Sequence, residues 1–232
     1  MQASSAIHAA GDQPREAVSF ERAALPIDPA RRGCDPIVAW SIAFASALAV
    51  MAAGHTSGAP SLVVAGAAIF LFIAVGNDVR SYRIPNLLTL PALAAALVVS
   101  PWCGAAGGPL EAMLGVATGF ALLLLPYAVG GMGAGDVKAL MALGAWLGPE
   151  TTFGATAWAL LGAGAFGVSL LALRGELADF FRRWGRIALA TLTLRRLVYE
   201  PPAPRRAAAG GIPFAAAVAF GLAVQWLEGS PW

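Results

Sequence analysis

Asp78 and Asp136 are the two residues of this chain whose type and placement suit catalysis. Each lies where a strongly apolar run meets a polar segment, beside glycine or helix-breaking residues. A carboxylate at the centre of a transmembrane helix costs about 2.5–3.5 kcal/mol on insertion scales, so such a residue usually has a function. Two carboxylates that meet share a proton, and the ionised one can activate water while the protonated one donates to a carbonyl oxygen. Such a pair can hydrolyse an amide, and we expect neither a metal ion nor a cofactor.

Other hydrolytic chemistries lack the residues that they need. His8 lies in the polar N-terminal segment and His55 in a short turn, so neither an HExxH zinc site nor a Ser-His-Asp arrangement is available. Lys138 is the only lysine, and no serine lies near it for a Ser-Lys dyad. The glycines within 130–135 do not fit the phosphate-binding pattern GxxxxGK[ST]. We expect them to let the backbone bend and pack closely where it enters the bilayer.

Each aspartate also has a structural interpretation. Asp136 can cap the helix that follows it, because an acidic residue near a helix N-terminus accepts free N–H groups and suits the helix dipole. Asp78 can pair with Arg80 or Arg83 as an ordinary interfacial residue. Both interpretations stay open for the single residues, but the placement of both carboxylates on one membrane face favours a functional pair.

The composition predicts a membrane protein. Hydrophobic residues make up 58% of the 232 positions and charged residues only 12%, whereas a soluble domain is about a quarter charged. We expect an all-α polytopic membrane protein, a bundle of about six or seven transmembrane helices with an aspartate pair that faces the cytoplasm. The predicted apolar runs are 37–53, 61–77, 87–102, 111–129, 137–147, 153–173 and 212–227. Six crossings remain if one short run is re-entrant or interfacial.

The arginines and the lysine predict the orientation. With seven crossings and the N-terminus inside, all 15 Lys and Arg residues fall in the inside segments, while the outside turns hold only acids. This partition favours a cytoplasmic N-terminus and places both aspartates at the cytoplasmic face. We therefore expect a polar, disordered cytoplasmic tail over 1–35 and a transmembrane domain over 36–232, with a basic cytoplasmic loop at 174–211. We expect no nucleic-acid partner.

The basic loop contains a helical pattern of apolar residues. Arginines alternate along the segment with the apolar residues Leu177, Phe180, Phe181, Trp184 and Ile187. This pattern predicts an amphipathic helix that lies on anionic lipid at the bilayer surface, and we favour that interpretation over a substrate site.

The motifs around the two aspartates resemble a known family. Gly133-Ala134-Gly135-Asp136 is followed by Val137-Lys138, and Asp78-Val79-Arg80 is followed by Ile84-Pro85-Asn86. A third stretch, Gly211-Ile212-Pro213-Phe214, is similar to the family's C-terminal motif, with Ala215-Ala216 where Gly-Pro is usual. The pattern is similar to the type IV prepilin peptidase family, the GxGD class of membrane aspartic proteases. The resemblance implies two catalytic residues, Asp78 and Asp136, and a set of supporting residues in the same motifs: Gly133, Gly135, Lys138, Pro85 and Asn86.

The resemblance also implies an activity and a partner. Larger bacterial members carry an insertion with two CxxC pairs and also N-methylate the trimmed pilin, whereas this chain has only Cys34 and Cys103. It therefore looks like the compact, peptidase-only branch that serves Flp/Tad-type pili in the bacterial cytoplasmic membrane. The implied substrate is a prepilin with a short basic leader and an apolar helix. Two other hypotheses use the same chain differently: a proton-coupled transporter with the aspartates as a relay, and a non-catalytic assembly partner of a secretion machine.

Overall fold

The regular structure of the described residues is entirely helical. The computed structural model describes residues 34–99, 102, 108–128, 132–194 and 213–229, which all fall in one compact unit, Gly33–Trp232. The predicted tail lies outside the described residues except for its last two positions. One of these, Asp35, caps the first helix, because its Oδ1 accepts the N–H of Ile37 at 2.9 Å. The all-α class predicted from the composition is confirmed.

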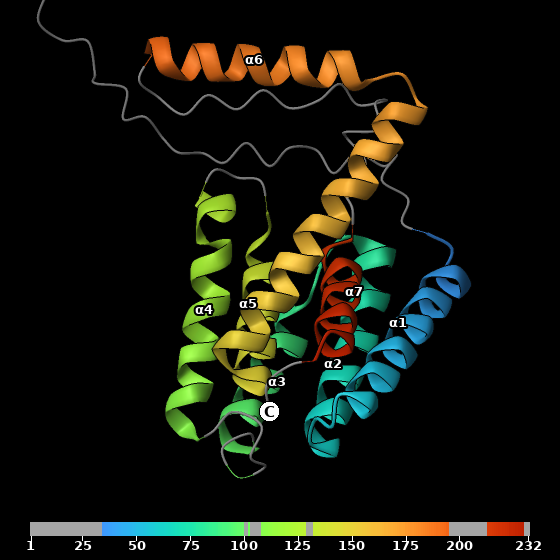
Figure 1. Cartoon of the computed structure of the whole chain (residues 1–232), viewed down its shortest axis with the longest axis vertical. Coiled ribbons are helices and arrows are strands. Elements are labelled where there is room, and N and C mark those ends of the chain that lie inside the picture. The colour runs from blue at the N-terminus through green and yellow to red at the C-terminus, as the bar shows by residue number, and fades with distance from the viewer. Residues whose placement is uncertain (1–33, 100–101, 103–107, 129–131, 195–212, 230–232) are drawn as a thin grey trace, which may run out of the picture. The chain divides into compact units, whose positions relative to one another are not determined.

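Four helices in the described part are long and apolar enough to cross a membrane. They are α1 (Pro36–Thr56), α2 (Ser61–Ser81), α4 (Pro109–Ala128) and α5 (Ala134–Leu173). Two shorter apolar helices accompany them, α3 (Asn86–Val99) and α7 (Phe214–Leu227), and the more polar α6 (Leu177–Leu194) lies in the predicted basic loop. Figure 1 shows the apolar helices side by side as a bundle. The chain is an all-α polytopic membrane protein.

Helix α5 corrects the predicted boundaries of the fifth and sixth apolar runs. The turn expected at 148–152 is reduced to one residue, Gly148, whose φ of 75° and ψ of 174° interrupt an otherwise continuous helix. Glycine adopts this conformation because it has no Cβ. Pro149 follows at once, and its ring favours the start of a helix because proline has no N–H to leave unpaired there. The helix therefore restarts without the loop that the sequence suggested.

The two halves of α5 run in opposite directions. Near its start, Gly135 packs against Ile84, which lies between α2 and α3. Beyond Gly148, Gly154 packs against Gln225, which lies near the end of α7, and Figure 1 shows α5 folding back at this level. Because α7 begins at the end of the bundle where Gly135 lies, the second half of α5 returns toward that end. The seven predicted apolar runs thus all correspond to helical segments.

Close backbone contacts hold α5 between α4 and α7. A Cβ atom on Gly115 of α4 would overlap the carbonyl oxygen of Gly144, and one on Gly221 of α7 would overlap the carbonyl oxygen of Ala155. Small residues at such positions let helices approach closely, which is how membrane helices gain packing energy without a hydrophobic driving force. The middle of α5 is therefore packed closely against α4 before Gly148 and against α7 after it.

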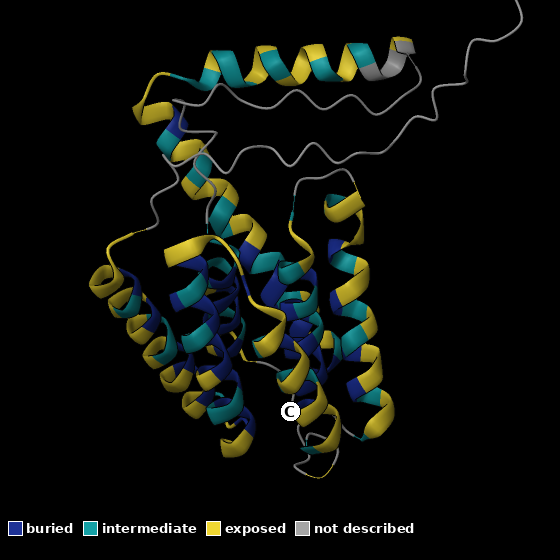
Figure 2. Cartoon of the chain, turned by 180° about the vertical axis from the view of Figure 1, so that it is seen from behind, coloured by how far each residue is buried: buried dark blue, intermediate teal, exposed yellow. Residues whose placement is uncertain are grey.

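The exposed surface of the bundle is apolar. Large side chains such as Leu87, Leu110 and Leu125 expose 87%, 70% and 73% of their area, while Figure 2 shows the buried residues concentrated where the helices face one another. Apolar patches of this extent are rare on soluble monomers and are expected on a surface that contacts lipid. The core therefore lies between the helices, and the aspartates belong to the helices that enclose it.

Candidate active site

Asp78 lies inside the last turn of α2 and not at its end. The sequence predicted that the apolar run stops at residue 77, but the helix continues to Ser81 because Val79 is still buried against the core. Tyr82 then ends the helix with a left-handed backbone (φ 50°), and its N–H donates to the Asp78 carbonyl oxygen at 2.7 Å. The Asp78 residue is only 4% exposed, so its carboxylate lies within the bundle.

The carboxylate of Asp78 caps helix α7 from outside that helix. Its Oδ2 accepts the N–H of Ala215 at 2.9 Å. Helix α7 begins after Pro213, whose side chain cannot cap it, so the first N–H groups need an acceptor from elsewhere. Within the described residues neither Arg80 nor Arg83 forms an ion pair with Asp78, so the interfacial ion pair considered from the sequence is not made.

The sequence did not reveal the contact between Asp78 and α7. Residues 213–214 were noted only as part of a motif, and residues 211–212 of that motif lie outside the described part of the chain. A usable signal was present, because the apolar run after Pro213 has no Ser, Thr, Asp or Asn before it. A buried helix start without such a residue requires an acceptor from another element.

Asp136 caps its own helix. It is the third residue of α5, and its Oδ2 accepts the N–H of the N-cap residue Gly133 at 3.1 Å. The capping interpretation considered from the sequence is therefore confirmed as a contact of this residue. The contact uses one oxygen of the carboxylate, and each ionised carboxylate has about four lone-pair sites. Capping and a chemical role are compatible for Asp136.

The two carboxylates lie close enough for their charges to interact. Asp78 comes from the last turn of α2 and Asp136 from the first turn of α5, and the residues that follow α2 contact the start of α5. Lys138 Nζ donates to Asn86 Oδ1 at 2.9 Å, and a Cβ atom on Gly135 would lie 2.9 Å from the carbonyl oxygen of Ile84. The first turn of α5 therefore packs directly on the segment that follows Asp78.

The remaining site residues named from the motifs lie at the same end of the bundle. The Pro85 carbonyl oxygen accepts the N–H groups of Leu88 and Thr89 at 3.0 and 3.3 Å and so starts α3. Gly133 supplies the N–H that Asp136 accepts. In the part of the chain that the structure describes, no three His, Cys, Asp or Glu side chains gather as metal ligands would. What this end of the bundle offers chemically is a pair of carboxylates, each oriented by N–H groups at a helix start.

The chain is thus an all-α membrane bundle in which two carboxylates from different helices lie near each other at one end. Residues 65–168 match the model of the type IV leader peptidase family, a segment that includes both aspartates. The resemblance identified from the motifs is confirmed over this segment. No solved structure matches the chain.

Two curated relatives were also found. Each is named a prepilin leader peptidase/N-methyltransferase, and they come from Burkholderia pseudomallei strains 1026b and K96243. Both are 37% identical to this chain over 101 residues, which is 40% of this chain and 32% of the relative. The match thus spans about a third of the length of the curated relatives.

Proposed function

We propose that this chain is a membrane-embedded aspartic peptidase that removes leader peptides from prepilins. The observation that carries the proposal is that Asp78 and Asp136 lie close enough for their charges to interact, within the segment that matches the leader peptidase family. Both carboxylates come from helices of a membrane bundle, and both are held by backbone N–H groups. This arrangement suits hydrolysis of a peptide bond beside a bilayer.

The proposed mechanism uses one proton shared by the two carboxylates. The ionised carboxylate takes a proton from water as the water oxygen bonds to the scissile carbonyl carbon, and the protonated carboxylate donates to the carbonyl oxygen. Collapse of the tetrahedral intermediate breaks the C–N bond, and the proton taken from water passes to the leaving amine. The N–H groups that Asp78 and Asp136 accept fix the two carboxylates and leave other lone pairs free for water and substrate.

The proposed substrate is a prepilin with a short basic leader followed by an apolar helix, cut at the cytoplasmic face of the bacterial membrane. The distribution of all 15 Lys and Arg residues supports this orientation, with the N-terminus and both aspartates on the cytoplasmic side. The curated relatives are named both as leader peptidases and as N-methyltransferases, and we propose only the peptidase activity for this chain. The proposal extends to Flp/Tad-type pili through the motif resemblance and the small number of cysteines.

The decisive experiment replaces each aspartate by asparagine. D78N and D136N keep an oxygen that can accept the same N–H groups, so both helix caps persist while ionisation is lost. Each variant is co-expressed with a prepilin, and leader removal is followed by the shift in pilin size on gels. Because general acid–base catalysis contributes about 10²–10⁴-fold, leader removal should fall below detection in both variants.

The control is E111Q, which changes an acid in the first turn of α4, at the end of the bundle away from the aspartates. E111Q should cleave as the parent protein does, and all three variants should reach the membrane at parental levels. Complete cleavage by either aspartate variant would overturn the proposal. If an aspartate variant still cleaves the prepilin completely and the purified protein takes up a solute into vesicles in response to a proton gradient, the transporter hypothesis is favoured instead.

A further inference from the structure

Helix α6 begins at the point where a spanning helix ends. Its predicted amphipathic character is confirmed, since Leu177–Leu194 is helical with apolar and polar residues on different sides. The second half of α5 ends at Leu173, and Gly175 (φ 68°) turns the chain into α6. Because α5 is long enough to cross a membrane, a helix that starts four residues after its end starts near the boundary between lipid and water.

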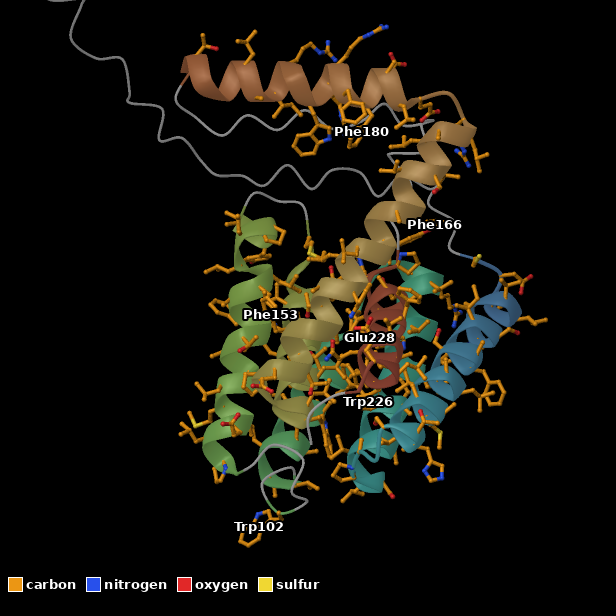
Figure 3. All side chains as sticks on the ribbon, viewed as in Figure 1. Trp102, Phe153, Phe166, Phe180, Trp226 and Glu228 are labelled. Atoms are coloured by element: carbon orange, nitrogen blue, oxygen red, sulfur yellow. The ribbon has the colours of Figure 1, made fainter. Side chains whose placement is uncertain are left out.

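One side of α6 presents an aromatic cluster, defined here as Phe180, Phe181 and Trp184. Ring centroids lie 5.6 Å apart for Phe180 and Phe181 and 6.1 Å apart for Phe180 and Trp184. Phe181 is 66% exposed and Trp184 is 46% exposed. At 100° per residue Leu177 and Ile187 fall on the same side, and Figure 3 shows Phe180 on the side of α6 turned toward the bundle. An aromatic face of this kind is typical of helices that lie in a membrane interface.

The arginines of α6 lie at the edge of the aromatic cluster and opposite it. The Arg183 guanidinium carbon lies 5.9 Å from the Phe180 ring centroid and 6.0 Å from that of Trp184. Arg182 and Arg186 project from the far side, where Arg182 lies 3.7 Å from its partner Asp179. Three arginines against one aspartate leave α6 with a net positive charge. A guanidinium matches the geometry of phosphate oxygens, and a long side chain at the border of an apolar face can reach them while its stem stays in the apolar layer.

We propose that α6 docks on the anionic phospholipid surface beside the end of α5, with the aromatic cluster at the boundary of acyl chains and headgroups. Charge complementarity selects this partner, since the helix is cationic and the bilayer is the obligatory neighbour of a spanning protein. A prepilin leader, which is basic, would be repelled by the same arginines. A second copy of this chain would place like charges against each other. The proposal does not depend on the peptidase function.

The docking is tested with the full-length protein in lipid nanodiscs, with Cys34 and Cys103 replaced by serine. A fluorophore is attached to a single cysteine introduced by F181C or, as the matched position on the polar side, by T193C. Lipids that carry a nitroxide at the acyl–headgroup boundary quench a fluorophore that lies at that depth. In discs with about a third phosphatidylglycerol, position 181 should be quenched at least several times more strongly than position 193, and in pure phosphatidylcholine this difference should shrink.

A charge variant measures the contribution of the arginines. Each Lys or Arg near an anionic surface contributes about 1 kcal/mol, or about fivefold, so R182Q/R186Q should lower the docking equilibrium constant about 25-fold. R205Q/R206Q removes the same charge elsewhere in the basic loop and should leave quenching at position 181 near the parental level.

Three results would overturn the proposal. The first is equal quenching at positions 181 and 193 in anionic discs. The second is quenching at position 181 that does not depend on phosphatidylglycerol. The third is that position 181 is shielded from the lipid nitroxide only in discs that hold two copies of the protein.

Discussion

The hydrogen bond between Ala215 and Asp78 can be removed without removing either helix. The substitution A215P deletes the N–H that donates to Asp78 Oδ2 at 2.9 Å. The first intrahelical bond of α7 is donated by Ala217 to the Pro213 carbonyl oxygen at 3.2 Å, so the Ala215 N–H has no partner within its own helix. Proline is tolerated in the first turn of a helix for this reason. A216P places proline in the same turn at an N–H that Asp78 does not accept, which makes it the matched control.

The expected magnitude follows from burial. A hydrogen bond to an ionised group contributes about 1.5–3 kcal/mol net, and water cannot readily replace the donor because Ala215 and Asp78 are 3% and 4% exposed. If this bond orients the Asp78 carboxylate in the transition state, its loss lowers the cleavage rate about 10- to 150-fold, since 1.36 kcal/mol corresponds to tenfold. The helix cap is lost as well, so the free energy of unfolding should fall by a similar 1.5–3 kcal/mol.

Two measurements on the purified protein separate these effects. The rate constant of leader cleavage is measured with a prepilin under single-turnover conditions. The folded fraction is measured by unfolding in a series of detergent mixtures, and the rate constant is divided by this fraction. A215P should be slow per folded molecule, whereas A216P should cleave within a few-fold of the parental rate. A parental rate for A215P would show that the N–H of α7 does not position the carboxylate. An equal loss in both variants would attribute the effect to the proline ring.

Two further predictions concern the backbone of α5. G144A places a methyl group against the carbonyl oxygen of Gly115 and should destabilise the fold by about 1–3 kcal/mol through separation of α4 and α5. G164A, where no atom lies within 4 Å, should instead stabilise it by about 0.5–1 kcal/mol in the same unfolding assay, and equal effects would contradict the packing described for Gly144. G148A forces an alanine into φ 75° and ψ 174° and should cost about 1–3 kcal/mol. Parental stability of G148A would mean that the two halves of α5 are joined by a different turn.

The fold class could be predicted because it depends on composition and on long apolar runs. Charged residues are scarce, and each run is bounded by Gly, Pro or polar residues, so the helices and the amphipathic α6 follow from local pattern alone. The boundaries depended on tertiary contacts. α2 continues past Asp78 because Val79 is buried, and α5 resumes directly after Gly148 because Pro149 favours a helix start.

The site could be predicted only in part, since sequence spacing shows which residues share a face and not which atoms meet. Asp78 and Asp136 were identified from their position at the edges of apolar runs. The acceptor role of Asp78 toward α7 joins residues that are 137 positions apart, and no local pattern predicts it. The cytoplasmic orientation and the catalytic roles remain predictions from charge distribution and motif resemblance.

The shortness of α3 and α7 has a consequence for the surrounding bilayer. Each has 14 residues, which corresponds to about 21 Å of helix against about 30 Å of hydrocarbon. Leu87 and Leu90 of α3 and Phe220 of α7 are more than half exposed, so lipid meets these short helices directly. A helix of this length spans the hydrocarbon only where the bilayer thins locally, or admits headgroups and water, by about 9 Å beside it. The acyl-chain length of the host membrane thus becomes a physical variable that acts on the bundle beside α3 and α7.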